Sequence, residues 1–316
     1  MANAAVDRVE TTAEVEESLK KKPRIGETII EGSLLVAGII SVAVTVGIVL
    51  ILFRDAIAFF QLPEVTLVDF FTDTIWQPQI GRFGVLPLLT ATLMISFIAM
   101  LVALPLGLFT AIYLSEYAQP RTRNTIKPIL EVLAGIPTVV YGYFALTFVT
   151  PVVLRGIFGD QNVSIYNMAA AGLVVGILVI PLVASLSEDA LHAVPNSLRE
   201  ASYGLGATKL ETAVRVVVPA ALSGIAAAFV VGISRAVGET MIVSIAAGAG
   251  PNLTLNPFES AETMTGYMVR ISGGDLSYDS VDYQSIFAIG LVVFSMTLAL
   301  NLISVRIVRR FREAYE

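Results

Sequence analysis

The chain has 316 residues, of which 55% are hydrophobic and 15% are charged. Soluble domains carry about 25% charged residues, so the composition excludes an ordinary soluble protein and indicates an integral membrane protein. The chain has no cysteine and one histidine, which excludes disulfides, thiolate metal sites and multi-histidine metal sites. The net charge of −6 gives no sign of a nucleic-acid partner.

The first stretch, residues 1–27, is polar, and its acidic residues are followed by a basic cluster that ends at Arg24. We expect a polar cytoplasmic tail that stops at the membrane surface. Residues 28–316 are then predicted to form one transmembrane domain. Its first apolar run, 32–53, has the ~20 residues that a bilayer requires and is too long for the hydrophobic region of a signal peptide.

Long apolar runs recur along the rest of the chain and predict an all-α integral membrane protein with six transmembrane helices. The predicted spans are residues 32–53, 85–114, 128–154, 168–186, 219–248 and 285–308. The longest polar segments between them are 54–84, 187–218 and 251–284.

The distribution of basic residues predicts the orientation, because the cytoplasmic loops of membrane proteins are enriched in Lys and Arg. With the N-terminus in the cytoplasm, the C-terminus and the segment 187–218 are cytoplasmic as well. Of the 20 Lys and Arg residues, those that then lie elsewhere are Arg54, Arg82, Arg155, Arg235 and Arg270. We therefore expect a multi-pass protein of the cell membrane with both termini in the cytoplasm.

The predicted span 128–154 contains the sequence Gly-Ile-Pro at 135–137, followed by Thr138 and Tyr141. A proline inside a span loosens the helix, and such breaks often line a pathway. Prolines also occur in ordinary transmembrane helices, so the pattern fits both readings. We take Thr138 and Tyr141 as candidates for the wall of a pathway.

The segment 187–218 is too polar to span, but its apolar residues recur at helical spacing up to Ala201. Gly204 and Gly206 then interrupt the helix, and a second helical piece follows. This pattern predicts a helix, a glycine turn and a helix along the membrane surface. An amphipathic helix that only covers lipid explains the periodicity equally well.

Arg235 lies inside the predicted span 219–248, and Glu239 follows four residues later on the same helix face. A lone arginine in the bilayer costs about 2.5–3.5 kcal/mol on insertion scales, so its presence needs a reason. One reading is a structural pair that neutralises itself. The other is that Arg235 binds an anionic substrate, since the guanidinium fork suits phosphate, while Glu239 holds the fork and Ser234 and Thr240 add hydroxyl groups.

The polar segment resembles a known family motif. The residues that carry the resemblance are Glu200, Ala201, Ser202, Gly206, Val216, Val218 and Pro219. Their spacing is similar to that of the EAA motif of ABC-importer permeases, with small substitutions at Ser202, Val216 and Val218. In that family the loop is cytoplasmic and docks on the ATPase subunit. The resemblance implies a type I ABC importer permease fold with cytoplasmic coupling helices between spans four and five, in which Glu200, Ala201, Gly204 and Gly206 contact or shape the contact with the ATPase.

Four further runs resemble phosphate-specific permeases, namely residues 102–107, 113–117, 133–142 and 234–240. The extra first span, the loop 54–84 and the arginine-rich C-terminus look more like the PstC-type subunit than the PstA-type subunit. The resemblance implies ATP-driven import of inorganic phosphate by alternating access. It also implies three partners in the membrane complex, namely a PstA-type permease subunit, an ATPase subunit dimer and an extracytoplasmic phosphate-binding protein.

The chain itself is predicted to be non-catalytic and to bind no metal or cofactor. It lacks the Walker A pattern, so ATP and Mg²⁺ are expected on the ATPase subunit. Three alternatives are kept. The permease could carry another oxyanion such as molybdate or sulfate. An ATP-independent channel or carrier predicts an inverted repeat, which the sequence does not display. An enzyme with Glu239 as general base needs a second catalytic group inside the bilayer.

Overall fold

The computed structural model describes residues 25–274, 277 and 280–311. The chain divides into two compact units, Met1–Ile51 and Leu52–Glu316. Helix α2 contributes its first part to one unit and its last part to the other. Most of the predicted polar tail, residues 1–24, lies outside the described residues.

The described residues are mostly helical, with one pair of short strands. In chain order the elements are α2 (Ile25–Phe60), α3 (Leu67–Thr72), β1 (Trp76–Gln77), η1 (Pro78–Ile80), β2 (Arg82–Phe83), α4 (Leu86–Ile112), η2 (Tyr113–Tyr117), α5 (Pro120–Ala134), α6 (Thr138–Phe144), η3 (Ala145–Leu154), α7 (Arg155–Phe158), α8 (Met168–His192), α9 (Asn196–Gly204), α10 (Lys209–Thr212), η4 (Ala213–Val217), α11 (Val218–Ala220), α12 (Leu222–Val237), α13 (Met241–Ala246), α14 (Met264–Ser272) and α15 (Val281–Phe311).

Five of these helices are long and apolar enough to cross a membrane. They are Gly26–Phe60, Leu86–Tyr117, Thr138–Phe158, Met168–His192 and Val281–Arg309. A sixth span is obtained if the helices Lys209–Ala220 and Leu222–Val237, which are bent by 73° at the break between them, are counted together. The predicted all-α membrane fold is therefore confirmed, with five or six spans among the described residues.

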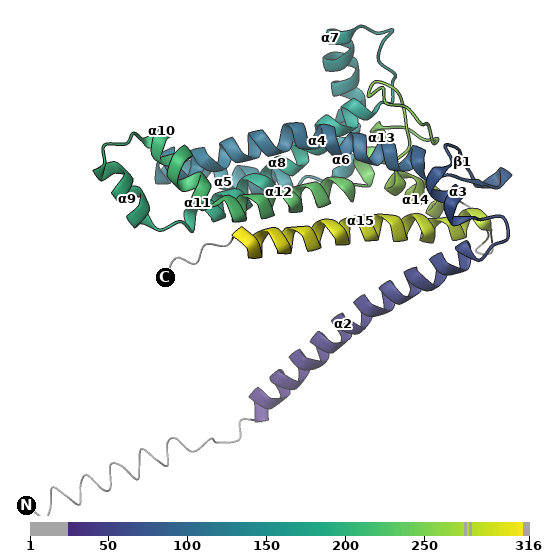
Figure 1. The fold of residues 1–316 in the computed structure, drawn as a ribbon, viewed down its shortest axis with the longest axis horizontal. Coiled ribbons are helices and arrows are strands. Elements are labelled where there is room, and N and C mark those ends of the chain that lie inside the picture. Colours follow the sequence, from purple (N-terminus) through teal and green to yellow (C-terminus); the bar gives the residue numbers. More distant parts are fainter. Residues whose placement is uncertain (1–24, 275–276, 278–279, 312–316) are drawn as a thin grey trace, which may run out of the picture. The chain divides into compact units, whose positions relative to one another are not determined.

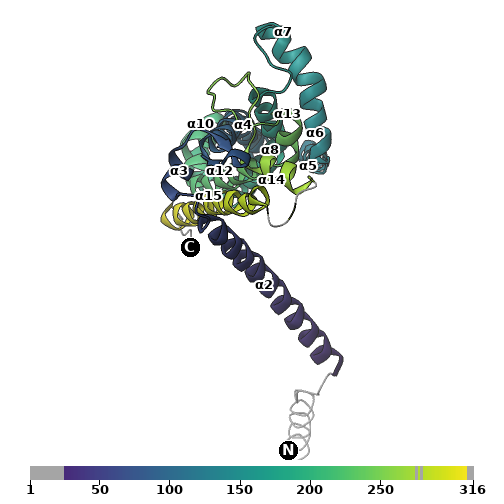
Figure 2. The ribbon, with the colours of Figure 1, turned by 90° about the vertical axis from the view of Figure 1, so that its right-hand side faces the viewer.

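The second unit is a bundle in which α4, α8, α12 and α15 run side by side (Figures 1 and 2). The α9–α10 segment lies at one end of this bundle, and α3, β1 and α14 lie at the other (Figure 1). The main core is built from small and branched apolar residues of α4 and α8, such as Ala99, Ala103, Val174 and Val175. Small residues let two helix backbones approach closely, which is the usual basis of packing in membranes.

Glycines make the contact between α4 and α8 possible. A Cβ atom added at Gly172 would lie 2.7 Å from the Cβ of Ile98, and one at Gly176 would lie 2.9 Å from the carbonyl oxygen of Ala99. Neither distance is tolerated between real atoms, so α8 needs glycine at both positions. This contact holds α4 and α8 together.

We expect Gly172→Val to destabilise the protein by about 1–3 kcal/mol, the usual cost of overpacking a close-packed core. The measurement is the thermal unfolding midpoint of the purified protein in detergent. Gly156→Val is the matched control, because no atom lies within 4 Å of a Cβ at that position. Equal midpoints for the two variants would contradict the close α4–α8 contact.

A proline-containing break at 135–137 gives the third predicted span a different form. Helix α5 begins at Pro120 and is half exposed, and the apolar span begins only at Thr138. Proline disfavours helical geometry in the residue before it, so Pro137 separates α5 from α6. The predicted span 128–154 therefore combines the end of an amphipathic helix with most of a membrane helix.

The segment 54–84, which the sequence predicts as a polar loop, contains the end of α2, α3 and the β1–β2 hairpin. Trp76 pairs with Phe83 across the two antiparallel strands. Their rings pack edge-to-face with Phe59 and Phe70 in a buried aromatic cluster. Edge-to-face pairs of this kind are favourable beyond the area they bury, so this end of the bundle is a folded cap.

Candidate functional site

The predicted fifth span is interrupted at the position of the charge pair. Helix α12 ends at Val237, and α13 begins at Met241. The Oε1 atom of Glu239 accepts hydrogen bonds from the backbone N–H groups of Met241 at 3.2 Å and Ile242 at 3.4 Å. The carboxylate thus satisfies backbone donors at the start of α13, which have no partner within that helix. Glu239 is therefore the residue that restarts the helix after the break.

Arg235 forms the predicted pair with Glu239. Its Nη1 atom lies 2.6 Å from Oε2 of Glu239. The two side chains differ sharply in burial, since 42% of the arginine but only 2% of the glutamate is exposed. Glu239 is the one hydrogen-bonding partner of this guanidinium within the described part of the chain. The arrangement leaves several N–H donors of Arg235 available to an anion.

The two hydroxyl candidates beside the pair differ in what they contact. Thr240 donates its hydroxyl hydrogen to the carbonyl oxygen of Gly238 at 3.1 Å, so it bonds back to its own chain. The Oγ atom of Ser234 is buried and has no hydrogen-bond partner among the residues that the structure describes. Of the two, Ser234 therefore keeps unused hydrogen-bonding capacity next to Arg235.

Thr265 also supports the break, and sequence reasoning missed this residue. Its buried hydroxyl donates to the backbone oxygen of Glu239 at 2.7 Å, from helix α14. This bond satisfies a carbonyl that the interrupted helix leaves open. The two residues are 26 positions apart in the chain. A pairing at that separation leaves no periodic pattern in a single sequence, so only the structure reveals it.

Tyr141 and Thr138, the second pair of candidates, lie on α6. The hydroxyl of Tyr141 donates to the carbonyl oxygen of Leu133 at 2.9 Å and so bridges the break at 135–137. Thr138 is half-buried. Helix α6 packs against α13, where a Cβ at Gly142 would lie 3.0 Å from the side chain of Ile245. Among the described residues, Thr138 and Tyr141 are linked to the Arg235 region through the contact between α6 and α13.

The polar segment forms the expected helix, turn and helix. Helix α9 ends at Gly204, and Gly206 has φ of +85°, a conformation that favours glycine. The next helix opens with a capping box, in which Thr208 and Glu211 exchange hydrogen bonds. A buried bond of 2.9 Å between the hydroxyl groups of Ser202 and Thr212 ties the two helices together.

The tip of this segment presents an exposed apolar surface next to a carboxylate. Leu205 is 90% exposed and Leu210 is 63% exposed. Glu200 and Ala201 are exposed on the preceding helix α9, and the Glu200 side chain makes no hydrogen bond or ion pair with the described part of the chain. Exposed apolar side chains on a rigid, well-tied turn are typical of a surface that contacts another protein.

No group of three or more potential metal ligands was found among the described residues. The candidate site combines two features. One is the partly exposed Arg235, which pairs with the buried carboxylate of Glu239 at the break between α12 and α13. The other is the rigid turn between α9 and α10, at one end of the bundle. Such a site can bind an anion by charge-assisted hydrogen bonds.

Comparison with known proteins supplies a family. Residues 103–313 match the family described as "Binding-protein-dependent transport system inner membrane component". The chain is 33% identical over 261 residues to the probable ABC transporter permease protein YqgH of Bacillus subtilis, covering 82% of this chain and 83% of the relative. It is 32% identical to the phosphate transport system permease protein PstC of Mesorhizobium japonicum, covering 72% and 74%.

Solved structures of similar fold include a bacterial alginate ABC transporter, with a TM-score of 0.65 and 15% identity over 92% of this chain and 98% of that one. Another is the MetNI methionine ABC transporter, with a TM-score of 0.53 and 20% identity over 73% of this chain and 95% of that one. At these identities the likeness extends to the fold alone.

Proposed function

Because the chain belongs to the family of binding-protein-dependent transport system inner membrane components, we propose that it carries inorganic phosphate as the permease subunit of an ATP-driven importer. The chain is an ABC transporter permease of the membrane and is not itself a catalytic subunit. Phosphate as the cargo rests on one observation above all, the half-exposed Arg235 beside a buried Glu239.

The exposure of Arg235 supports a pathway that this chain does not enclose alone. An arginine that faced lipid inside the membrane would be costly, yet 42% of this side chain is uncovered by the chain itself. A second permease subunit that covers this face would complete the passage. We propose a PstA-type subunit in that position, so that Arg235 lines the passage between the two subunits.

The position of Glu239 supports reversible binding of the anion. The carboxylate stays in place through its bonds to the backbone of α13, so it can hold Arg235 when no substrate is bound. Phosphate oxygens would then compete with it for the guanidinium. This competition would keep the anion from binding so tightly that it could not leave, which transport by alternating access requires. We propose the buried hydroxyl of Ser234, which has no partner among the described residues, as a further group of the site.

The other partners follow from the two ends of the bundle. We propose that the α9–α10 end and both termini face the cytoplasm, as the basic residues predict. The exposed Glu200 and Ala201, with the turn at Gly204 and Gly206, then contact one subunit of an ATPase dimer, which binds ATP and Mg²⁺. The opposite end faces an extracytoplasmic phosphate-binding protein. Lipid covers the remaining apolar helices.

Anion identity is tested by uptake of labelled phosphate into vesicles that hold the reconstituted complex, with binding protein outside and ATP inside. We expect excess unlabelled phosphate to abolish uptake of the label, whereas excess sulfate or molybdate leaves most of it. Competition by sulfate or molybdate that equals competition by phosphate would favour a permease for another oxyanion.

A further inference from the structure

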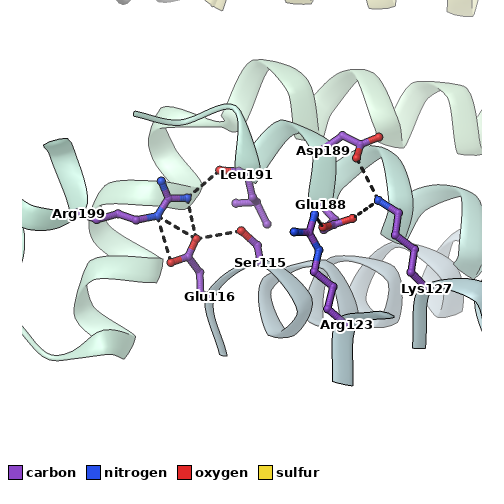
Figure 3. Close-up of polar contacts among 8 residues, drawn as sticks. All are labelled: Ser115, Glu116, Arg123, Lys127, Glu188, Asp189, Leu191 and Arg199. Carbon is purple, nitrogen blue, oxygen red and sulfur yellow. Dashed lines mark hydrogen bonds and ion pairs between the residues drawn. The ribbon is translucent and has the colours of Figure 1, made fainter. Parts of the chain in front are cut away.

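Two clusters of ion pairs lie at the end of the bundle that carries α9 and α10 (Figure 3). The first joins Glu116 to Arg199, and the second joins Glu188 to Arg123 and Lys127. The Glu116–Arg199 pair is largely buried, with 6% and 13% of the side chains exposed. A buried ion pair adds little net stability over apolar packing, and the hydrogen bonds of this pair hold Arg199 of α9 against Glu116.

Arg199 connects three helices with one guanidinium group (Figure 3). It belongs to α9, and its Nη2 atom donates to Oε1 of Glu116 at 2.9 Å, in η2, which continues α4. Its Nη1 atom donates to the carbonyl oxygen of Val194 at 2.6 Å, just beyond α8. Nη2 also donates to the carbonyl oxygen of Leu191 at 2.9 Å. The carbonyls near the end of α8 carry partial negative charge, which favours a cation there.

The second cluster extends the connection to α5. Glu188 is fully buried on α8, just before Leu191. Its carboxylate forms ion pairs with Arg123 and Lys127 of α5. The Nζ atom of Lys127 lies 2.7 Å from Oε2 of Glu188. This hydrogen bond raises the pKa of Lys127, so the lysine stays charged. The ends of α4, α5 and α8 are thus joined to each other and, through Arg199, to α9.

A short series of contacts links the ion-paired helix ends to the proposed anion site at Arg235. Helix α5 leads to the break at 135–137, which Tyr141 bridges by its bond to Leu133. Helix α6 then packs against α13, whose start is held by Glu239, the partner of Arg235. Rigid elements in contact can carry a displacement between distant sites when both sites bias the same motion.

We propose that Arg199 is a positioning residue that makes α9, α4 and α8 move as one body, and so couples ATP hydrolysis to phosphate movement. The inference rests on the proposed function, in which α9 contacts the ATPase. The role requires the planar, multi-donor guanidinium group. Lysine is a point charge on a flexible stem and cannot bond the carboxylate and both carbonyls at once.

The test compares Arg199→Lys and Glu116→Gln with the wild-type complex in vesicles, where ATP hydrolysis and phosphate uptake are measured on the same sample. We expect ATP hydrolysis to stay within about twofold and phosphate moved per ATP to fall about fivefold, within the range by which residues along a coupling route change coupling. Arg121→Lys is the matched control for Arg199→Lys, because it makes the same exchange, with the charge kept, at an arginine that is exposed on α5.

A double variant adds a second readout. If the two residues act through each other, Arg199→Lys combined with Glu116→Gln is no more uncoupled than Arg199→Lys alone. Additive losses, or an unchanged amount of phosphate per ATP, would overturn the proposal. A parallel loss of hydrolysis and uptake would reduce the pair to a structural role and overturn it as well.

If the Arg199→Lys complex does not assemble, the Glu116→Gln complex alone tests the proposal through its phosphate moved per ATP. That substitution preserves the side-chain shape at 116 and the bonds from Arg199 to the end of α8. A wild-type complex that shows neither phosphate-stimulated hydrolysis nor uptake would instead count against the proposed function.

Discussion

Replacing Arg235 with glutamine should lower phosphate uptake by about a hundredfold while the complex still assembles. A bidentate arginine offers two charge-assisted hydrogen bonds to phosphate, together worth about 3 kcal/mol, which corresponds to about a hundredfold. Glutamine cannot supply the charge or the paired donors. The measurement is the initial rate of phosphate uptake by vesicles that hold the complete complex.

The variant should fold, because the break does not depend on Arg235 alone. Glu239 keeps its hydrogen bonds from the backbone of Met241 and Ile242, and Thr265 keeps its bond to the backbone oxygen of Glu239. The remaining cost is that of a buried carboxylate without its counter-charge. That cost would appear as a lower unfolding midpoint and not as a loss of assembly.

The chain contains a matched control for this variant. Arg270 is 45% exposed and pairs with Glu262, which is 2% exposed, so its burial pattern is almost that of the Arg235 pair. It lies at the opposite end of the bundle from α9, on α14 (Figure 1). We expect Arg270→Gln to lower stability to a similar degree and to keep most of the uptake. If both variants transport phosphate at the wild-type rate, the Arg235 pair is structural.

Replacing Gly206 with alanine should weaken attachment of the ATPase by about tenfold. The backbone of Gly206 has φ of +85°, and a residue with a Cβ atom pays roughly 1–2 kcal/mol there, where 1.4 kcal/mol is a factor of about ten. No atom lies within 4 Å of an added Cβ, so the effect comes from the backbone and not from a clash. The measurement is a titration of the ATPase onto the purified permease pair.

Gly250→Ala controls for strain alone. Gly250 has φ of +105° and equally open surroundings, but it lies beyond α13, far along the chain from the α9–α10 turn. We expect it to destabilise the permease without changing the affinity for the ATPase. Equal affinities for the Gly206→Ala and Gly250→Ala complexes would show that the turn is not the attachment point.

Local patterns in the sequence predicted much of this structure. The membrane helices follow from the length of apolar runs, and the Arg235–Glu239 pair follows from its spacing of four residues. The turn at Gly206 follows from the steric freedom of glycine. Each of these features depends on neighbours in the chain, so one sequence contains the information needed.

Features that depend on distant residues could not be predicted in this way. Glu116 and Arg199 are 83 residues apart, and no periodicity links them. The interruption at 238–240 requires both the Glu239 carboxylate at the start of α13 and Thr265 from α14. The sequence predicts that the third span starts at Pro128. In the structure Pro128 lies inside α5, and the next helix, α6, begins at Thr138, directly after Pro137.

The dependence of phosphate uptake on ATP tests the central claim most directly. Vesicles that contain the two permease subunits are loaded with ATP and compared with and without the ATPase, in the presence of the binding protein. The account predicts uptake only when the ATPase and ATP are both present, together with ATP hydrolysis that phosphate stimulates. Movement of phosphate down its gradient through this chain without the ATPase would contradict it.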